Sequence, residues 1–203
     1  MIRLYRFAFS TNVERVALAL AHKGLEAESV WIDPDDRSEI ERVSGQRLVP
    51  VLEEDGRVVS DSMEIVSYLE ERYPEPPLYP ADPARRAELD VFVEWFNRVW
   101  KRAPNEIEAE LLKTEPDRER IAALGAQMRE WLGLFEALLD GRDYLFGNEP
   151  SAADFAAFPF VKYAVLWEEG DDELFHQILR DYQGEPGPRV EAWIRRIDSL
   201  PRG

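Results

Sequence analysis

Three short polar segments of the chain contain side chains whose types and spacing could do chemistry. Residues 10–12 place two hydroxyls and an amide, Ser-Thr-Asn, between an apolar run and an amphipathic helix pattern. Asp61 and Ser62 open a second helix pattern, and residues 44–50, SGQRLVP, place an arginine before a Val-Pro pair. A helix N-terminus offers free N–H groups and a favourable dipole, so polar side chains there either cap the helix or help to hold an anion.

The residue types that the chain lacks exclude several other kinds of chemistry. There is no cysteine, which excludes disulfides, thiolate ligands and catalysis by a protein thiol. The two histidines, His22 and His176, do not favour a zinc site or a Ser-His-Asp triad, and we expect no metal. A thiol in the active site would therefore have to arrive with a ligand.

The charge of the chain narrows the choice of ligand. Its 203 residues carry a formal net charge of −16, which repels nucleic-acid phosphates and anionic membrane surfaces. No apolar run approaches the roughly 20 residues of a membrane span, and the N-terminus lacks the apolar core of a signal peptide. We therefore expect a cytoplasmic protein that binds neither nucleic acid nor membrane. An anionic ligand would need a locally basic site, for which Arg6, Arg15 and Arg47 are candidates.

The hydrophobic pattern divides the chain into an α/β part and an all-α part. In the first part we expect strands at 2–7, 27–32, 49–52 and 58–60, and helices at 13–20, within 33–43 and at 61–73. In the second part we expect helices at 88–102, 121–139, 151–167, 171–182 and 188–200. Five prolines between Tyr73 and Pro83 can continue neither a helix nor a central strand. We place the boundary there and expect domains at 1–76 and 77–203.

The order of these motifs resembles that of the cytosolic glutathione transferases. The resemblance is carried by FSTNVERVALALAHKGL at 9–25, LVPVL at 48–52, VVSDSMEIVSYLEERYP at 58–74, the proline-rich linker and PSAADFAAFPF at 150–160. Each motif alone is weak, but their order and spacing cover essentially the whole chain. The resemblance implies a thioredoxin-like N-terminal domain followed by a helical C-terminal domain, with glutathione as a substrate.

By this resemblance, two of the three segments bind glutathione. In thioredoxin-like folds Pro50 would follow a cis peptide bond, which turns the backbone of Val49 toward the cysteinyl part of glutathione. Asp61 would pair with the γ-glutamyl amine, and Ser62 would hold the γ-glutamyl carboxylate. A helix cap by Asp61 and a structural turn at Pro50 are the alternatives.

The glycyl carboxylate of glutathione has two candidate partners. Many members of the family carry a lysine immediately before the Val-Pro pair, whereas this chain carries Leu48. Arg47 and Gln46 are then the candidates, and a solvated loop arginine is the alternative.

Ser10 matches the catalytic position of the bacterial serine-type transferases. Their motif S-P-x-x-R-R-V aligns with Ser10–Val16, although Thr11 replaces the proline. The resemblance implies that the Ser10 hydroxyl donates a hydrogen bond to the glutathione thiolate, with Asn12 or Thr11 as alternatives. The sequence also allows a helix cap, either by Thr11 with Glu14 in a capping box or by Ser10 itself.

The resemblance further implies an electrophile pocket and a homodimer. We expect Phe9, Phe96, Trp100 and Arg102 to line the pocket, although aromatic residues at helical spacing more often belong to a core. In the dimer, the helix at 61–73 of one subunit would face the helix at 88–102 of the other.

The expected activity is conjugation of the glutathione thiolate to a hydrophobic electrophile, as in the glutathione S-transferases that serve detoxification. A glutathione-dependent isomerase of the maleylacetoacetate type also uses a serine at this junction, but its SSCSWR-like motif is absent here. A non-catalytic, transferase-like binding or scaffold protein is the third possibility. The presence of Ser10, Val49-Pro50 and Asp61-Ser62 together argues against it.

Overall fold

A four-stranded mixed sheet forms the centre of the N-terminal part of the chain. The computed structural model describes residues 1–203. The strands are β1 (Ile2–Arg6), β2 (Ala27–Trp31), β3 (Val51–Glu54) and β4 (Arg57–Ser60), in the spatial order β2-β1-β3-β4. β1 runs parallel to β2 and antiparallel to β3, and β3 and β4 form an antiparallel pair. The predicted order of βαβ, then α, then ββα is confirmed.

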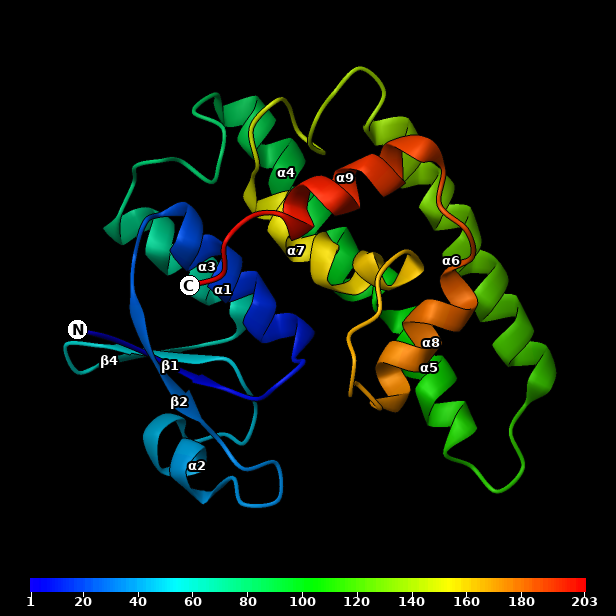
Figure 1. Cartoon of the computed structure of the whole chain (residues 1–203), viewed down its shortest axis with the longest axis horizontal. Coiled ribbons are helices and arrows are strands. Elements are labelled where there is room, and N and C mark those ends of the chain that lie inside the picture. The colour runs from blue at the N-terminus through cyan, green and yellow to red at the C-terminus, as the bar shows by residue number, and fades with distance from the viewer. The chain divides into compact units, whose positions relative to one another are not determined.

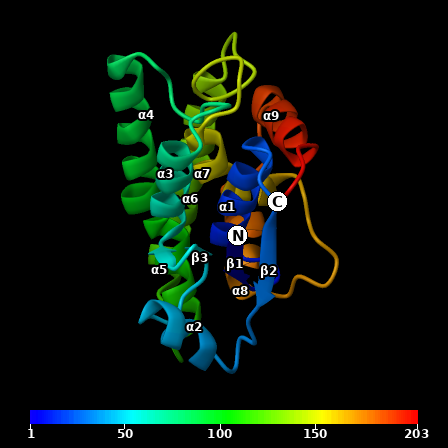
Figure 2. The ribbon, with the colours of Figure 1, turned by 90° about the vertical axis from the view of Figure 1, so that its left-hand side faces the viewer.

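Three helices cover the two faces of this sheet. Helices α1 (Thr11–His22) and α3 (Ser62–Arg72) lie on one face, and α2 (Ser38–Ser44) lies on the other (Figures 1 and 2). On the α2 face, Tyr5 packs in a buried cluster with Ile32, Ile40 and Val51. Since side chains alternate along a strand, the neighbouring Leu4, which is fully buried, points to the opposite face of the sheet, which α1 and α3 cover.

A buried lysine fastens the proline-rich segment to the N-terminal domain. The side chain of Lys23 has no exposed surface, and its ammonium donates to the Glu70 carboxylate of α3. It also donates to the carbonyls of Pro74 and Pro76, at 3.3 and 2.7 Å. Because a buried ammonium is tolerated only where its donors are paired, Lys23 fixes the path of the chain after α3.

The last four residues return to the N-terminal domain. By their contacts, the residues form two units, here called the N-terminal domain (Met1–Pro80 with Leu200–Gly203) and the helical domain (Ala81–Ser199). Arg202 pairs with Glu14 of α1 at 2.9 Å. The N–H of Gly203 donates to the carbonyl of Ala17, also at 2.9 Å.

The helical domain is all-α, as predicted. Its helices are α4 (Pro83–Trp95), the π-helical turn η1 (Phe96–Trp100), α5 (Arg102–Leu111), α6 (Arg118–Leu138), α7 (Ala152–Val161), the 3₁₀ turn η2 (Lys162–Ala164), α8 (Leu174–Gln183) and α9 (Pro188–Asp198). None of these helices combines the length with the apolar character that a membrane-spanning helix requires.

One predicted helix is divided in the structure. The sequence pattern predicts a single helix over 88–102, but the chain forms a π-helical turn and then starts α5. Pro104 provides the physical reason, because it cannot donate to the carbonyl of Trp100 and its ring would clash with that group. The N–H of Lys101 instead donates to the carbonyl of Phe96 at 3.0 Å.

Helix α7 lies at the centre of the helical domain and is buried along its whole length. A capping box begins this helix, with Ser151 as the cap and Asp154 three residues later. The Asp154 carboxylate also accepts from the indole N–H of Trp193 in α9 at 2.8 Å. One side chain thus caps α7 and joins it to the last helix.

Candidate active site

Three chain junctions meet at one end of the sheet. In the register of the sheet, Tyr5 of β1 is opposite Val51 of β3, and Val51 is opposite Ser60 of β4. Because β3 runs opposite to β1 and β4, its first residue lies beside their last ones. The start of α1, the Val-Pro pair and the start of α3 therefore gather at this end.

Ser10 is the N-cap residue of α1. Its dihedral angles are extended (φ −67°, ψ 113°), and its Oγ accepts from the N–H of Val13 at 3.4 Å. Thr11 is already helical and buried, so the alternative in which Thr11 caps the helix with Glu14 is wrong. The cap bond of Ser10 is long for a hydrogen bond, and a hydroxyl that accepts can still donate. Ser10 therefore keeps its hydroxyl hydrogen for a ligand while its oxygen caps the helix. Asn12, the alternative candidate, is half-buried.

The segment before β3 has the predicted cis bond between Val49 and Pro50. The side-chain amide of Gln46 donates to the carbonyl of Leu48 at 2.8 Å, and its oxygen accepts the Leu48 N–H. Arg47 forms an exposed ion pair with Glu41 at 2.8 Å, and such pairs are worth about 0–1 kcal/mol. Arg47 can therefore leave Glu41 for a ligand carboxylate at small cost, whereas Gln46 is occupied within the loop.

Asp61 and Ser62 form the N-terminus of α3. Asp61 caps the helix, since its Oδ1 accepts the N–H of Met63 at 2.8 Å and of Glu64 at 3.3 Å. Because one oxygen makes both bonds, the other is available to a ligand amine. Ser62 is buried, and its Oγ accepts a hydrogen bond from Arg15 of α1 at 3.2 Å.

Arg37 is a cation at this end of the sheet that sequence reasoning missed. Its guanidinium lies over the ring of Phe7, 4.8 Å from the centroid. It donates to the carbonyls of Pro34 and Arg47, at 3.0 and 3.3 Å. Its approach to Phe7 depends on how β1 and the loop after β2 fold together, so no local motif could have indicated it.

Of the four residues predicted to line an electrophile pocket, two are exposed and two are buried. Phe9 is 37% exposed, and the exposed Arg102 pairs with Glu106 at 2.6 Å. Phe96 and Trp100 are 0% and 1% exposed, and their rings stack with centroids 4.6 Å apart. These two rings have a structural role in the helical core, and the lining of the electrophile pocket stays a prediction.

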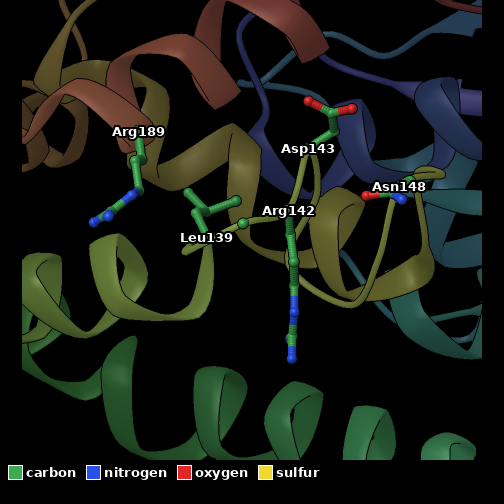
Figure 3. A pocket seen from close by; sticks show the side chains of 6 residues that line it. Leu139, Arg142, Asp143, Asn148 and Arg189 are labelled. Carbon is green, nitrogen blue, oxygen red and sulfur yellow. The ribbon is translucent and has the colours of Figure 1, made fainter.

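A surface pocket of about 340 Å³ lies on the helical domain (Figure 3). It is lined by Leu139, Gly141, Arg142, Asp143, Asn148 and Arg189. Two of its charged lining residues form ion pairs with neighbours: Arg189 with Asp140 at 2.6 Å, and Asp143 with Arg196 at 3.0 Å. None of the predicted site residues lines it, and we assign it no part in the reaction.

Models of known protein families match both domains. The model of the glutathione S-transferase N-terminal domain matches residues 4–77, and that of the glutathione S-transferase C-terminal domain matches residues 118–196.

Three known proteins are similar over nearly the whole chain. The glutathione S-transferase GstB of Escherichia coli K12 is 31% identical over 211 residues, which cover 99% of this chain and 95% of GstB. FtsZ-localized protein A of Caulobacter vibrioides is 32% identical over 217 residues, which cover 98% of this chain and 87% of that protein. The theta class glutathione S-transferase of Xanthomonas axonopodis pv. citri, solved with glutathione bound, superposes with a TM-score of 0.73 at 26% identity, over 98% of this chain and 93% of that one.

Proposed function

Because this chain belongs to the cytosolic glutathione transferase superfamily, we propose that it binds glutathione in its N-terminal domain and conjugates the glutathione thiolate to a hydrophobic electrophile. One observation carries the proposal. The segments with Ser10, with the cis Val49–Pro50 pair and with Asp61–Ser62 gather at the same end of the sheet. Glutathione has a thiol in its middle residue and charged groups at both ends, so it requires three such groups of contacts.

Each part of glutathione has a partner in this proposal. The backbone of Val49 pairs with the cysteinyl residue, as one rung of an antiparallel ladder. Ser62 and the N-terminus of α3 bind the γ-glutamyl carboxylate, and the free oxygen of Asp61 binds the γ-glutamyl amine. Arg47 exchanges its exposed pair with Glu41 for the glycyl carboxylate.

Ser10 stabilises the thiolate by donating its hydroxyl hydrogen to the sulfur. Lowering the pKa of a thiol by two units requires about 2.7 kcal/mol. A hydrogen bond to a charged group contributes about 1.5–3 kcal/mol, and the N-terminus of α1 adds about 0.3–1 kcal/mol. Together they supply about 1.8–4 kcal/mol, a range that includes the required free energy, so a hydroxyl and a helix N-terminus can shift the pKa of the thiol by two units without a histidine or a metal. The sulfur then attacks the electrophile.

We expect wild-type protein to bind glutathione in a calorimetric titration, and the Ser62→Ala variant to bind it at least about tenfold more weakly, since a charge-assisted hydrogen bond is lost. Ser29→Ala, at an exposed serine of β2, is the matched control and should bind like the wild type. The absence of binding by the wild type at millimolar glutathione would overturn the proposed function.

A glutathione-binding or scaffold protein without turnover is the second candidate. FtsZ-localized protein A, which is 32% identical to this chain, is named for its localization and not for a reaction, and this supports the second candidate. Activity assays with a panel of aryl halides and enones distinguish the two, because a scaffold would bind glutathione and convert none of them. An isomerase of the maleylacetoacetate type would instead convert a cis-enone without consuming glutathione.

We also propose a homodimer, in which α3 of one subunit faces α4 and η1 of the other. Val91 and Val99 are 69% and 43% exposed on α4 and η1, and burial of such side chains would favour association. Sedimentation velocity should therefore give a species of twice the chain mass of 23.5 kDa. The double variant Val91→Glu/Val99→Glu should be a monomer. Leu112→Glu, at an exposed leucine outside the proposed interface, should remain a dimer. A monomeric wild type at tens of micromolar would contradict the proposal.

A further inference from the structure

Glu14 places a carboxylate next to the proposed catalytic serine. It lies in the first turn of α1, and its backbone N–H donates to the carbonyl of Ser10 at 3.0 Å. Residues four apart share one face of a helix, and helical side chains lean toward the N-terminus, so Glu14 leans back over the turn that begins at Ser10. The serine-type motif has an arginine at this position, and this chain therefore carries the opposite charge there.

The charge of Glu14 opposes the proposed chemistry. A helix N-terminus favours a negative charge, but here the carboxylate and the glutathione thiolate would be two anions at the same N-terminus. The Glu14 side chain is only 15% exposed, so water screens its charge incompletely. Without a partner, Glu14 would disfavour the thiolate and raise the pKa of the thiol.

Arg202 is the partner of Glu14. Its Nη2 and Nε donate to the same carboxylate oxygen, at 2.9 and 3.3 Å, and its Nη1 donates to the carbonyl of Leu200. The next residue, Gly203, donates its N–H to the carbonyl of Ala17 in α1 at 2.9 Å. These contacts on both sides of the guanidinium hold it beside the first turns of α1.

Other cations lie near this pair. Arg15, the next residue of α1, donates to the hydroxyl of Ser62 at 3.2 Å. Arg6 of β1 donates to the carbonyl of Gly203 at 3.5 Å. An experiment that leaves Arg6 and Arg15 unchanged can therefore assign a change in the thiol to the pair itself.

We propose that Arg202 is a positioning residue for the glutathione thiolate: its ion pair with Glu14 keeps the charge of that carboxylate from acting on the sulfur at Ser10. The proposal rests on the proposed function, because Arg202 acts on a bound sulfur through Glu14. A tail that only fastens the chain to α1 would affect stability and would leave the titration of the thiol unchanged.

The test is a double-mutant cycle, in which ultraviolet titration measures the pKa of the glutathione thiol in the complex. Arg202→Gln leaves Glu14 unpaired and should raise this pKa by about half a unit to one unit, as expected for a partly screened unit charge at this distance. Glu14→Gln leaves Arg202 unpaired and should lower it. The double variant removes both charges and should titrate like the wild type.

Ionic strength separates the charge of Arg202 from its shape. At about 1 M salt the Debye length is about 3 Å, so the difference between Arg202→Gln and the wild type should shrink. A displaced tail would instead change the thiol at any salt concentration. Arg202→Lys keeps the charge and should restore most of the wild-type titration.

Arg3→Gln is the matched control. It removes another arginine–glutamate pair of the same domain, between Arg3 and Glu28 at 3.0 Å. Arg3 lies near the start of β1, whereas the candidate site lies beyond the end of that strand. The thiol titration of Arg3→Gln should therefore match that of the wild type. Thermal unfolding of each variant shows whether the titrated protein is folded.

Three results would overturn the role of Arg202. They are an unchanged thiol pKa in Arg202→Gln, an equal rise in the Glu14→Gln background, and a rise that persists undiminished at about 1 M salt. If Arg202→Gln does not fold, Glu14→Gln decides, because an unchanged pKa in that variant would show that charge at this position does not reach the sulfur. A wild type that binds no glutathione would instead refute the glutathione site itself.

Discussion

Replacing Asp154 by alanine should lower the free energy of unfolding by about 3–5 kcal/mol, the upper range for a single substitution. The carboxylate is fully buried and accepts four hydrogen bonds. Its partners are the N–H of Leu145, the N–H and hydroxyl of Ser151, and the indole N–H of Trp193, all at 2.7–2.9 Å. Removing it leaves these donors without an acceptor, and each unpaired buried donor costs about 1–3 kcal/mol.

Urea denaturation followed by circular dichroism measures this effect, and the chain offers a close control. Asp117 caps α6 by accepting the N–H of Arg120 at 3.0 Å, but it is exposed. Asp117→Ala should cost only about 1 kcal/mol, as for an ordinary N-cap. Trp193→Phe, which removes one donor of the buried network, should lie between the two. If Asp154→Ala cost no more than Asp117→Ala, the buried network would not be an important source of stability.

Replacing Ser10 by alanine should raise the pKa of the glutathione thiol in the complex by about one to two units. The physical reason is the loss of a hydrogen bond to a charged sulfur, worth about 1.5–3 kcal/mol, with 1.36 kcal/mol for each unit. The thiolate forms as the pH rises through the pKa of the thiol. The variant complex should therefore need a higher pH than the wild-type complex to reach the same fraction of thiolate. Ultraviolet titration of the thiolate in both complexes measures the shift, and turnover near pH 7 should fall roughly ten- to a hundredfold.

The controls for Ser10 are its neighbours. Asn12→Ala should leave the thiol titration close to that of the wild type if Ser10 is the donor. An unchanged thiolate population between pH 6 and 8 in Ser10→Ala would transfer the role to Asn12, Thr11 or backbone N–H groups. Because Ser10 also caps α1, the unfolding midpoint of the variant must be measured alongside its titration.

Much of the candidate site could be predicted because its signals are local. A capping residue such as Asp61 stands next to the helix that it caps, and the capping box of α7 joins Ser151 to a residue three positions later. The competing caps at 10 and 11 could not be separated in the same way. Either hydroxyl suits an N-cap, and the decision depends on where the turn after β1 ends.

The contacts that sequence reasoning could not supply join residues far apart in the chain. Arg15 meets Ser62 across 47 positions, and Trp193 meets Asp154 across 39. Each requires two helices to pack in one particular register, which residue patterns within either helix do not determine. The division of the predicted helix at 88–102 has a local cause. The sequence contains Pro104, but this proline acts on the carbonyl of Trp100, four residues earlier, where the helical pattern is otherwise regular.

The backbone of Asp61 has a consequence for how this site can change under selection. Its φ of +73°, with ψ of 131°, is a conformation that glycine adopts freely and that other residues adopt at a cost of about 1–3 kcal/mol. Glycine would relax the backbone but would remove the carboxylate that caps α3 and faces the proposed amine. Selection for thermal stability alone can therefore favour loss of the acid, whereas selection for ligand binding retains it.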